Sequence, residues 1–343
     1  MTGVGRPEMV LHANKKGIET MGKKSTAEVV SFGEPMIGIY PPPDCSMADD
    51  VPLSKTWGGD TSNAALALSR LGHKVAYVTR VGSDGFGHSF LKLWRDRGVD
   101  TSQVKIDKEQ RTGLYFISYE EGKHEFTYYR KNSAASFITP EDIDWDFLRQ
   151  AKVLHLSGIS QGISKKALEV SFDLLEFAKK HHIVISYDVN YRPALWKKEV
   201  ARAVILHTIE HYADILEITD DEMRFLGLGD RPEEVINHLS RIPKICAVKM
   251  GEQGCYLRQD KMEMRVKTFT VDVGDTVGAG DAFDAGLISG FLDNMAFDRL
   301  GLFANAVASL TCRGIGPLSM QPTREEVQSF LESSDRLSFH QGH

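Results

Sequence analysis

The sequence is poor in cysteine, carries no large excess of charge and contains no long apolar run. Its four cysteines are scattered and fit no common zinc-binding spacing, so we expect reduced thiols and no disulfide framework. No segment approaches the ~18 consecutive apolar residues of a membrane-spanning helix, so we expect no membrane partner. The net charge of −6 argues against a protein that a basic surface holds on nucleic acid.

Three common catalytic motifs are also missing from the sequence. There is no Gly-x-x-x-x-Gly-Lys-Ser/Thr phosphate loop, no Gly-x-Gly-x-x-Gly dinucleotide fingerprint and no His-Glu-x-x-His zinc motif. These absences disfavour a P-loop enzyme, a dinucleotide-dependent dehydrogenase and a zinc protease of the common types.

The first 27 residues are polar and contain several lysines but no apolar core of ~7–15 residues, so they do not read as a secretory signal. We expect residues 1–27 to be a disordered N-terminal extension that contributes nothing to a functional site. The folded part of the chain is then predicted to span residues 28–343 and to lie in the cytoplasm.

Short apolar runs of β type alternate with helical periods along the rest of the chain, which indicates an α/β fold. This alternation predicts a mostly parallel central sheet with helices on both faces. The expected strands are 28–40 with a break at Gly33, 75–81, 153–157, 183–189, 215–219, 245–249 and 254–258. The expected helices are 61–71, 86–97, 165–181, 232–240, 281–292 and 300–311.

Two stretches interrupt this alternation. Residues 41–57 are irregular and rich in proline, and residues 113–130 carry β-type residues on both sides of Glu-Glu-Gly-Lys, which indicates a hairpin. We expect these two inserts to form a small β lid over the larger α/β body.

The strongest functional signal is Gly-Asp-Thr-Val-Gly-Ala-Gly-Asp-Ala-Phe at 274–283, where small residues open a helix. The backbone N–H groups of a helix start, with the helix dipole, form an anion site, and Gly278, Ala279 and Gly280 let a ligand approach closely. Asp281 then has two readings. It caps the helix, or it takes a proton from an attacking hydroxyl.

Two further turns are weaker signals. Gly251 and Gly254 follow the strand that ends near Lys249, which suits either a nucleotide-binding turn or a plain hairpin turn. Gly59 and Asp60 precede a helix, where Asp60 either caps that helix or faces a ligand.

The order and chemistry of these elements resemble the ribokinase-like (PfkB) carbohydrate kinases over residues 28–330. Both family signatures are present in order, the Gly-Gly pair before the first helix and Asp-Thr-Val-Gly-Ala-Gly-Asp-Ala-Phe near the C-terminus. The resemblance implies a three-layer ribokinase-like fold and ATP-dependent phosphorylation of a sugar with Mg²⁺. In such an enzyme Asp281 is the general base, and the backbone at Gly278, Ala279 and Gly280 is the anion hole.

The resemblance also implies binding roles for other residues. Glu222 is the expected magnesium residue, although Thr219 stands where the family usually has asparagine. Asp275 and the Val277 backbone match positions near a monovalent cation such as K⁺ in some relatives. The residues expected around the nucleotide are Asp188, Asn190, Lys249, Gly251, Gly254, Thr276, Gly278, Gly280 and Asn305.

The stretches 126–136 and 188–193 resemble those of 2-keto-3-deoxygluconate kinases, which act on a sugar acid. Guanidinium groups bind carboxylates through paired hydrogen bonds, and Arg130 and Arg192 are the candidates. The alternative for Arg130 is an ion pair with Glu120 or Glu125, and for Arg192 a pair with a structural aspartate. The other residues expected at the sugar are Gly59, Asp60, Asn63, Tyr115 and Tyr128.

These observations predict an ATP-dependent 2-keto-3-deoxygluconate kinase that forms the 6-phosphate. A fructokinase or another neutral-sugar kinase is the alternative, and a non-catalytic sugar-binding protein is a second one. Exposed strand edges are usually covered, so we also expect a homo-oligomer: a dimer that forms through the β lid, or a higher assembly of such dimers.

Overall fold

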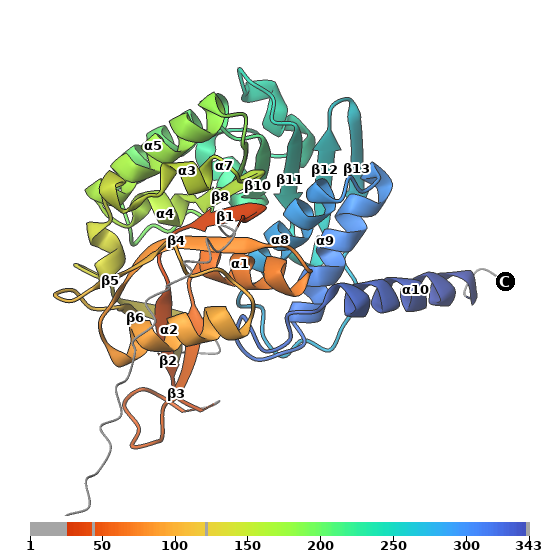
Figure 1. The fold of residues 1–343 in the computed structure, drawn as a ribbon. Helices are drawn as coiled ribbons and strands as arrows, with labels where there is room; N and C mark the ends of the chain where they lie inside the picture. The colour runs from red at the N-terminus through yellow and green to blue at the C-terminus, as the bar shows by residue number, and fades with distance from the viewer. Residues whose placement is uncertain (1–25, 43–44, 121–122, 341–343) are drawn as a thin grey trace, which may run out of the picture.

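The computed structural model describes residues 26–42, 45–120 and 123–340. Its centre is a nine-stranded sheet with the order β13-β12-β11-β10-β9-β8-β1-β4-β5 (Figure 1). The parallel strands are β1 (Val29–Phe32), β4 (Val75–Gly82), β5 (Val104–Asp107), β8 (Val153–Ser157), β9 (Val184–Asp188), β10 (Ile215–Thr219) and β11 (Ile245–Lys249). The strands β12 (Cys255–Gln259) and β13 (Met262–Val266) continue one edge in antiparallel fashion.

Helices cover both faces of this sheet, as the alternating pattern predicted. One apolar layer joins the central strands to α3 (Trp145–Leu148), α5 (Lys165–Lys180), α6 (Lys198–His211) and α7 (Asp220–Leu226), next to the short α4 (Gly158–Gly162). The opposite layers contain α1 (Asp60–Arg70), α2 (Gly85–Asp96), α8 (Ala279–Leu292), α9 (Phe297–Thr311) and α10 (Arg324–His340). Because both faces are covered, strands such as β1 and β8 are buried at every position.

The lid is a separate four-stranded sheet with the order β3-β2-β6-β7, below the main sheet in Figure 1. It consists of β3 (Ser54–Gly58), β2 (Met36–Tyr40), β6 (Gly113–Glu120) and β7 (Lys123–Tyr129). The predicted hairpin is confirmed, since β6 pairs with β7 in antiparallel register.

Several expected boundaries need correction. The single strand expected at 28–40 is two strands in different sheets, because β2 leaves the main sheet after Gly33 and joins the lid. The stretch 41–57, expected to be irregular, contributes β3. The helix expected at 232–240 is a 3₁₀ turn, η3 (Pro232–His238). The helices α3, α4, α6, α7 and α10 and the strands β5 and β13 were not predicted.

The N-terminal boundary also differs from the expected one. Residues 1–25 of the predicted extension lie outside the described residues, while Ala27 is buried in the core. Among the described helices, none combines the length and the apolar character that crossing a bilayer requires.

Three short 3₁₀ turns complete the connections, η1 (Ala134–Phe137), η2 (Pro140–Asp142) and η4 (Gly251–Gln253). The carboxyl ends of β9, β10 and β11 and the amino ends of α1 and α8 meet at the edge of the main sheet that the lid faces. Ligands of open α/β sheets bind at such strand ends, so this edge is the place to look for a functional site.

Candidate active site

A cleft of about 730 Å³ lies between the lid and the carboxyl ends of the central strands. The structure brings most of the sequence-predicted site residues together along its wall. These are Gly59, Asp60, Asn63, Tyr115, Tyr128, Asp188, Asn190, Arg192, Glu222, Lys249, Gly251, Thr276, Gly278, Gly280 and Asp281. They come from segments far apart in the chain, which supports the interpretation of these motifs as parts of one site.

The amino end of α8 opens into this cleft. Gly278 precedes the helix in the left-handed conformation, with φ of 81°, which disfavours a side chain there. A Cβ atom at Gly278 would also lie 2.5 Å from the Cβ of Pro317. In the first turn the backbone N–H of Ala279 donates to the carbonyl oxygen of Thr276 at 3.2 Å, and that of Ala282 donates to Gly278 at 2.9 Å. The N–H groups of Gly280 and Asp281 are therefore the ones that a bound anion would meet at this helix start.

Asp281 lies in this first turn and faces the cleft. Its Oδ2 accepts a hydrogen bond of 2.8 Å from Nδ2 of Asn63, and the helix itself begins at Gly278 without a side-chain cap. Burial, together with the nearby carboxylate of Asp60, raises the pKa of Asp281 to about 7. A carboxylate with a pKa near neutrality is suited to remove a proton from a bound hydroxyl.

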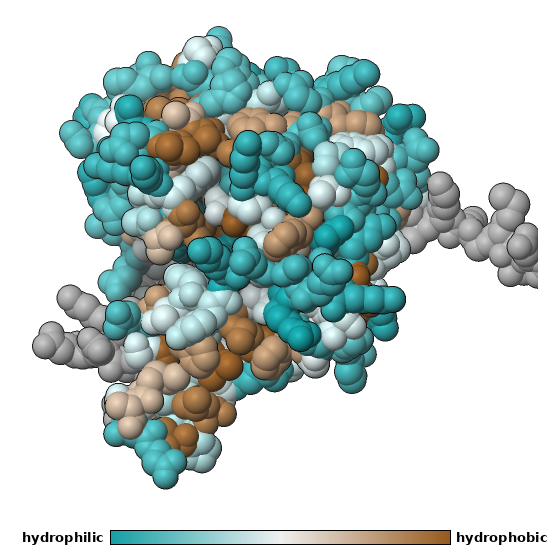
Figure 2. Space-filling view, turned by 90° about the vertical axis from the view of Figure 1, so that its left-hand side faces the viewer, coloured by the Kyte–Doolittle hydropathy of each residue, from teal (hydrophilic) through white to brown (hydrophobic). Residues whose placement is uncertain are grey.

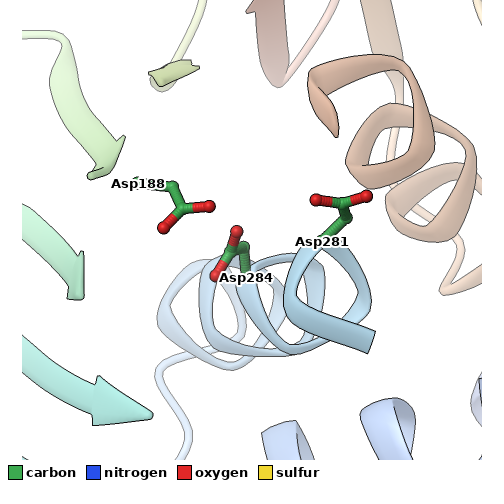
Figure 3. Close-up of side chains that lie close together, drawn as sticks. All are labelled: Asp188, Asp281 and Asp284. Carbon is green, nitrogen blue, oxygen red and sulfur yellow. The ribbon is translucent and has the colours of Figure 1, made fainter. Parts of the chain in front are cut away.

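A cluster of charged side chains lies beside Asp281 (Figure 3). Asp281 and Asp284 project from α8, and Asp188 projects from the end of β9, with carboxylate oxygens within 4.8 Å of one another. Nζ of Lys249 donates hydrogen bonds of 3.0 Å to Asp188 and 2.9 Å to Asp284. Burial alone would lower the pKa of Lys249, but these two carboxylates hold the pKa well above its ordinary value, so the cation persists.

Asp60 begins α1 on the opposite wall. Its Oδ2 accepts hydrogen bonds from Oγ of Ser157 and, at 3.2 Å, from Nδ2 of Asn190. Its Oδ1 is buried and has no hydrogen-bond partner within the described part of the chain. Burial raises the pKa of Asp60. Because an unpaired buried carboxylate oxygen is costly, a ligand hydroxyl is the expected partner of Oδ1.

Glu222 connects two of the loops that border the cleft. Its Oε2 accepts from the backbone N–H of Thr219 at 2.9 Å, and its Oε1 accepts from the backbone N–H of Tyr191 at 2.7 Å. Burial is the main cause that raises the pKa of Glu222. Through these two hydrogen bonds Glu222 holds the loop after β9 against the start of α7.

The two candidate arginines lie in different surroundings. Arg192 lines the cleft, and its Nη1 donates to the carbonyl oxygen of Tyr191 at 3.0 Å. Arg130 does not line the cleft, because its guanidinium forms an ion pair with Glu34, a buried residue that also accepts a hydrogen bond of 2.5 Å from Ser133. The observed partner of Arg130 is thus neither of the two glutamates that the sequence suggested.

Four other expected residues also lie outside the cleft lining. Ala279 begins α8 between two lining glycines, and the other three have visible structural contacts. A Cβ atom at Gly254 would lie 2.0 Å from the carbonyl oxygen of Val266, so this turn requires glycine. Nδ2 of Asn305 donates to the carbonyl oxygens of Val266 and Lys267, at 3.2 Å each. Asp275 accepts from the backbone N–H groups of Val277 and Gly316, at 3.0 Å each, and so joins the two loops beside α8.

Sequence reasoning missed two residues that shape the site. Asp284 was missed because a lone aspartate in an apolar helix resembles a solvated position. Its spacing of three from Asp281, which puts both on one helix face, was the available signal. Ser157 was missed because it ends a buried strand without a motif around it.

Comparisons with known proteins agree with this geometry. The model of the pfkB family carbohydrate kinases matches residues 26–324. The chain is 34% identical to a probable fructokinase-3 of Arabidopsis thaliana, across 90% of this chain and 92% of that protein. It is 33% identical to the 2-dehydro-3-deoxygluconokinase of Bacillus subtilis, across 89% and 96%.

Solved structures give the same result. An uncharacterized sugar kinase from Pyrococcus horikoshii, determined in complex with ATP, superposes with a TM-score of 0.79 at 28% identity, over 89% of this chain and 99% of that one. The fructokinase and the deoxygluconokinase are almost equally similar in sequence, so similarity does not single out the sugar-acid substrate that the motifs suggested. It does define the family: the chain belongs to the pfkB family of carbohydrate kinases.

Proposed function

We propose that this carbohydrate kinase phosphorylates 2-keto-3-deoxygluconate at its 6-hydroxyl with ATP as the donor. The observation that carries the proposal is that one cleft contains both Asp281, at the amino end of α8, and the guanidinium of Arg192. Asp281 can remove the proton of an alcohol, and Arg192 can bind a carboxylate through paired hydrogen bonds. A sugar acid has both groups, whereas fructose and ribose have no carboxylate.

In this proposal Asp281 accepts the proton of the attacking hydroxyl while Asn63 holds its other side through the 2.8 Å hydrogen bond. The backbone N–H groups of the first turn of α8 face the oxygens of the transferred phosphoryl group. Lys249, whose Nζ lies 3.7 Å from the place that a Cβ of Gly280 would occupy, adds positive charge beside them. Phosphoryl transfer depends mainly on such positioning and charge stabilisation.

The cleft also fits a magnesium ion chemically, because its walls offer carboxylate oxygens, the ligands that Mg²⁺ prefers. Glu222, with Asp220 and Asp221 beside it, would hold the hydrated ion, and the bound ion would neutralise charge on the phosphates. Asp275 remains the proposed residue for a monovalent cation such as K⁺.

The substrate proposal predicts the behaviour of Arg192 variants. Arg192→Ala is expected to raise KM for the sugar acid at least ten-fold and to change KM for neutral sugars less than three-fold, because only the acid loses a charged partner. Arg192→Lys should recover only part of the loss, since an ammonium cannot form the paired bonds. The measurement is steady-state kinetics with 2-keto-3-deoxygluconate, fructose and ribose, with MgATP held at saturation.

Arg149→Ala, which removes an exposed arginine of the body, is the matched control and should leave these constants unchanged. If Arg192→Ala raises KM for the sugar acid and for the neutral sugars equally, Arg192 does not bind the carboxylate. If the wild-type enzyme prefers fructose, the neutral-sugar alternative, with which the similarity to fructokinases agrees, replaces the proposal.

We also propose a homodimer that forms through the lid. The lid ends in two edge strands, β3 and β7, and Tyr129 on β7 is 65% exposed. Figure 2 shows apolar residues gathered on the lower part of that face, where the lid lies. Strand edges with exposed apolar side chains are commonly covered by a partner.

The dimer predicts a defined change in mass. Light scattering at micromolar concentration should give about twice the chain mass of 38.3 kDa, and Tyr129→Asp should shift the mass to that of one chain. Met262→Asp is the control, because Met262 is 49% exposed on β13, the edge strand of the main sheet. A monomeric wild-type protein, or a dimer broken only by Met262→Asp, contradicts the lid interface.

A further inference from the structure

The phenol ring of Tyr115 lies across two glycines of the lid. Tyr115 on β6 is the register partner of Gly38 on β2, and β2 in turn pairs with β3, which ends at Gly58. A Cβ atom at Gly38 would lie 2.6 Å from both Cζ and the hydroxyl oxygen of Tyr115, and one at Gly58 would lie 2.5 Å from that hydroxyl. Neither position can carry a side chain while the ring stays there.

The other side of the ring is also occupied. The ring centroids of Phe126 and Tyr128 lie 6.0 Å and 6.2 Å from that of Tyr115, and all three rings line the cleft. A ring displaced from the glycines therefore has to move toward these neighbours and into the cleft. The two glycines form a slot, and this slot decides where the Tyr115 hydroxyl lies, next to the turn that leads into Asp60.

The wall that the lid presents to the cleft differs in charge from the body wall. The lid residues that line the cleft are Met36, Tyr115, Phe126 and Tyr128, all uncharged. Burial raises the pKa of Tyr115, so its hydroxyl stays protonated and can donate a hydrogen bond. The carboxylates of the lining come instead from the body, as Asp60, Asp188, Asp220, Asp221, Glu222 and Asp281.

This separation of charge orients an acidic acceptor. A carboxylate that faced the acidic groups of the body wall would meet like charges, whereas one that faced the lid would meet a neutral surface with a phenol donor. The cations of the lining, Arg192 and Lys249, belong to the body. The acceptor hydroxyl would then point to Asp281, as phosphoryl transfer requires.

We propose that Gly38 and Gly58 are specificity-determining residues, because the slot that they form holds the Tyr115 hydroxyl where it binds the acidic end of the acceptor. The inference rests on the proposed function for the identity of the acceptor. Gly38 and Gly58 act through Tyr115, so they are positioning residues, and Tyr115 is the residue that touches the substrate.

The test combines glycine variants with a variant of Tyr115. Gly38→Ala and Gly58→Ala should each raise KM for the acceptor about ten-fold or more and leave KM for ATP within two-fold. Tyr115→Phe keeps the ring and removes the hydroxyl, so it should lower the ratio of kcat/KM for the sugar acid to that for fructose about ten-fold. Gly85→Ala is the control, because a Cβ there meets no atom within 4 Å.

A double variant separates positioning from folding. Tyr115→Ala removes the clash but also empties the space of a buried ring, so the effect of Gly38→Ala is compared in the two backgrounds. Gly38→Ala should lower Tm less in the Tyr115→Ala background than in the wild type, while KM for the acceptor stays high in the double variant. The slot is refuted if Gly38→Ala leaves the acceptor KM unchanged for whichever sugar the wild type phosphorylates. It is equally refuted if the double variant regains the wild-type KM.

Failure of the proposed function gives a different result. A wild-type enzyme that does not phosphorylate the sugar acid disproves that function before any variant is measured, and the glycine variants then test the slot with the neutral sugar. If Tyr115→Phe loses acid and neutral activity equally, the hydroxyl does not select the acid, and that part of the inference is overturned.

Discussion

Asp281→Asn is expected to lower kcat by about 10²- to 10⁴-fold while KM for ATP changes little. The loss has this size because a positioned general base contributes about that factor, and asparagine keeps the volume and the hydrogen-bonding capacity of the side chain but cannot take a proton. Steady-state kinetics with the preferred sugar measure the effect. Asp298→Asn, an exposed first-turn position of α9, is the matched control and should be silent.

The same residue predicts the pH dependence of the wild type. With a pKa of about 7, Asp281 is deprotonated above neutrality, so kcat/KM should fall about ten-fold per pH unit below that value and level off above it. Asp281→Asn should remove this dependence. A near-normal kcat in the variant, or a wild-type profile that is flat between pH 5 and pH 8, would remove Asp281 from the mechanism.

Although Asp281→Asn is expected to lower activity, it should raise the stability of the fold at neutral and alkaline pH. The folded pKa lies above the usual value for aspartate, so the protonated form is favoured in the fold, and ionisation costs stability progressively as the pH rises from about 4 to about 7. The variant should therefore unfold at a higher temperature than the wild type at pH 8, and this difference should disappear toward pH 4. Burial makes the ionised carboxylate of Asp281 costly for the fold, so its retention is explained by its proposed role in catalysis.

Asp281 and its anion hole could be predicted because their signal is contiguous. Ten neighbouring residues contain the tight turn, the helix start and the carboxylate, and local backbone geometry brings them together. The parallel α/β body was predictable for a similar reason, since strand and helix periods are local patterns. Even α6 had a usable signal, because its buried residues Ala201, Ile205 and Ile209 recur at a spacing of four.

Contacts between distant segments could not be predicted in the same way. Gly33 marks a break in residues 28–40, but nothing there indicates that the second half joins a different sheet, because both halves are apolar and β-prone. The partner of Arg130 was sought among glutamates near it in sequence, but the lid fold brings Glu34 to it instead. The slot at Gly38 depends on the register of β2 against β6, which no local pattern gives.

The ion pairs of Lys249 also join segments that are distant in the sequence, and its removal should strongly destabilise the fold. Nζ of Lys249 lies between Asp188 and Asp284, at 3.0 Å and 2.9 Å, and all three side chains are largely buried. Lys249→Met keeps the length of the side chain but leaves two carboxylates without their cation. Breaking a buried ion pair from one side typically costs about 3–5 kcal/mol, so we expect a loss of that order in the free energy of unfolding.

A second substitution tests this explanation. In Lys249→Met/Asp284→Asn one of the unpaired charges is removed, so the double variant should regain a substantial part of the lost stability, as measured by urea unfolding at pH 8. Lys244→Met is the control, because Lys244 is exposed and lies 3.8 Å from its carboxylate partner, and it should change stability by less than about 1 kcal/mol.

The activity of the double variant should not recover along with its stability. Lys249 supplies positive charge beside the first turn of α8 and lowers the pKa of Asp281, so without it KM for ATP should rise and the fall of kcat/KM should move to higher pH. A stabilised double variant with normal KM for ATP and an unshifted pH profile would show that Lys249 only balances buried charge. If Lys249→Met is as stable as the wild type, the buried ion pairs do not stabilise the fold as proposed.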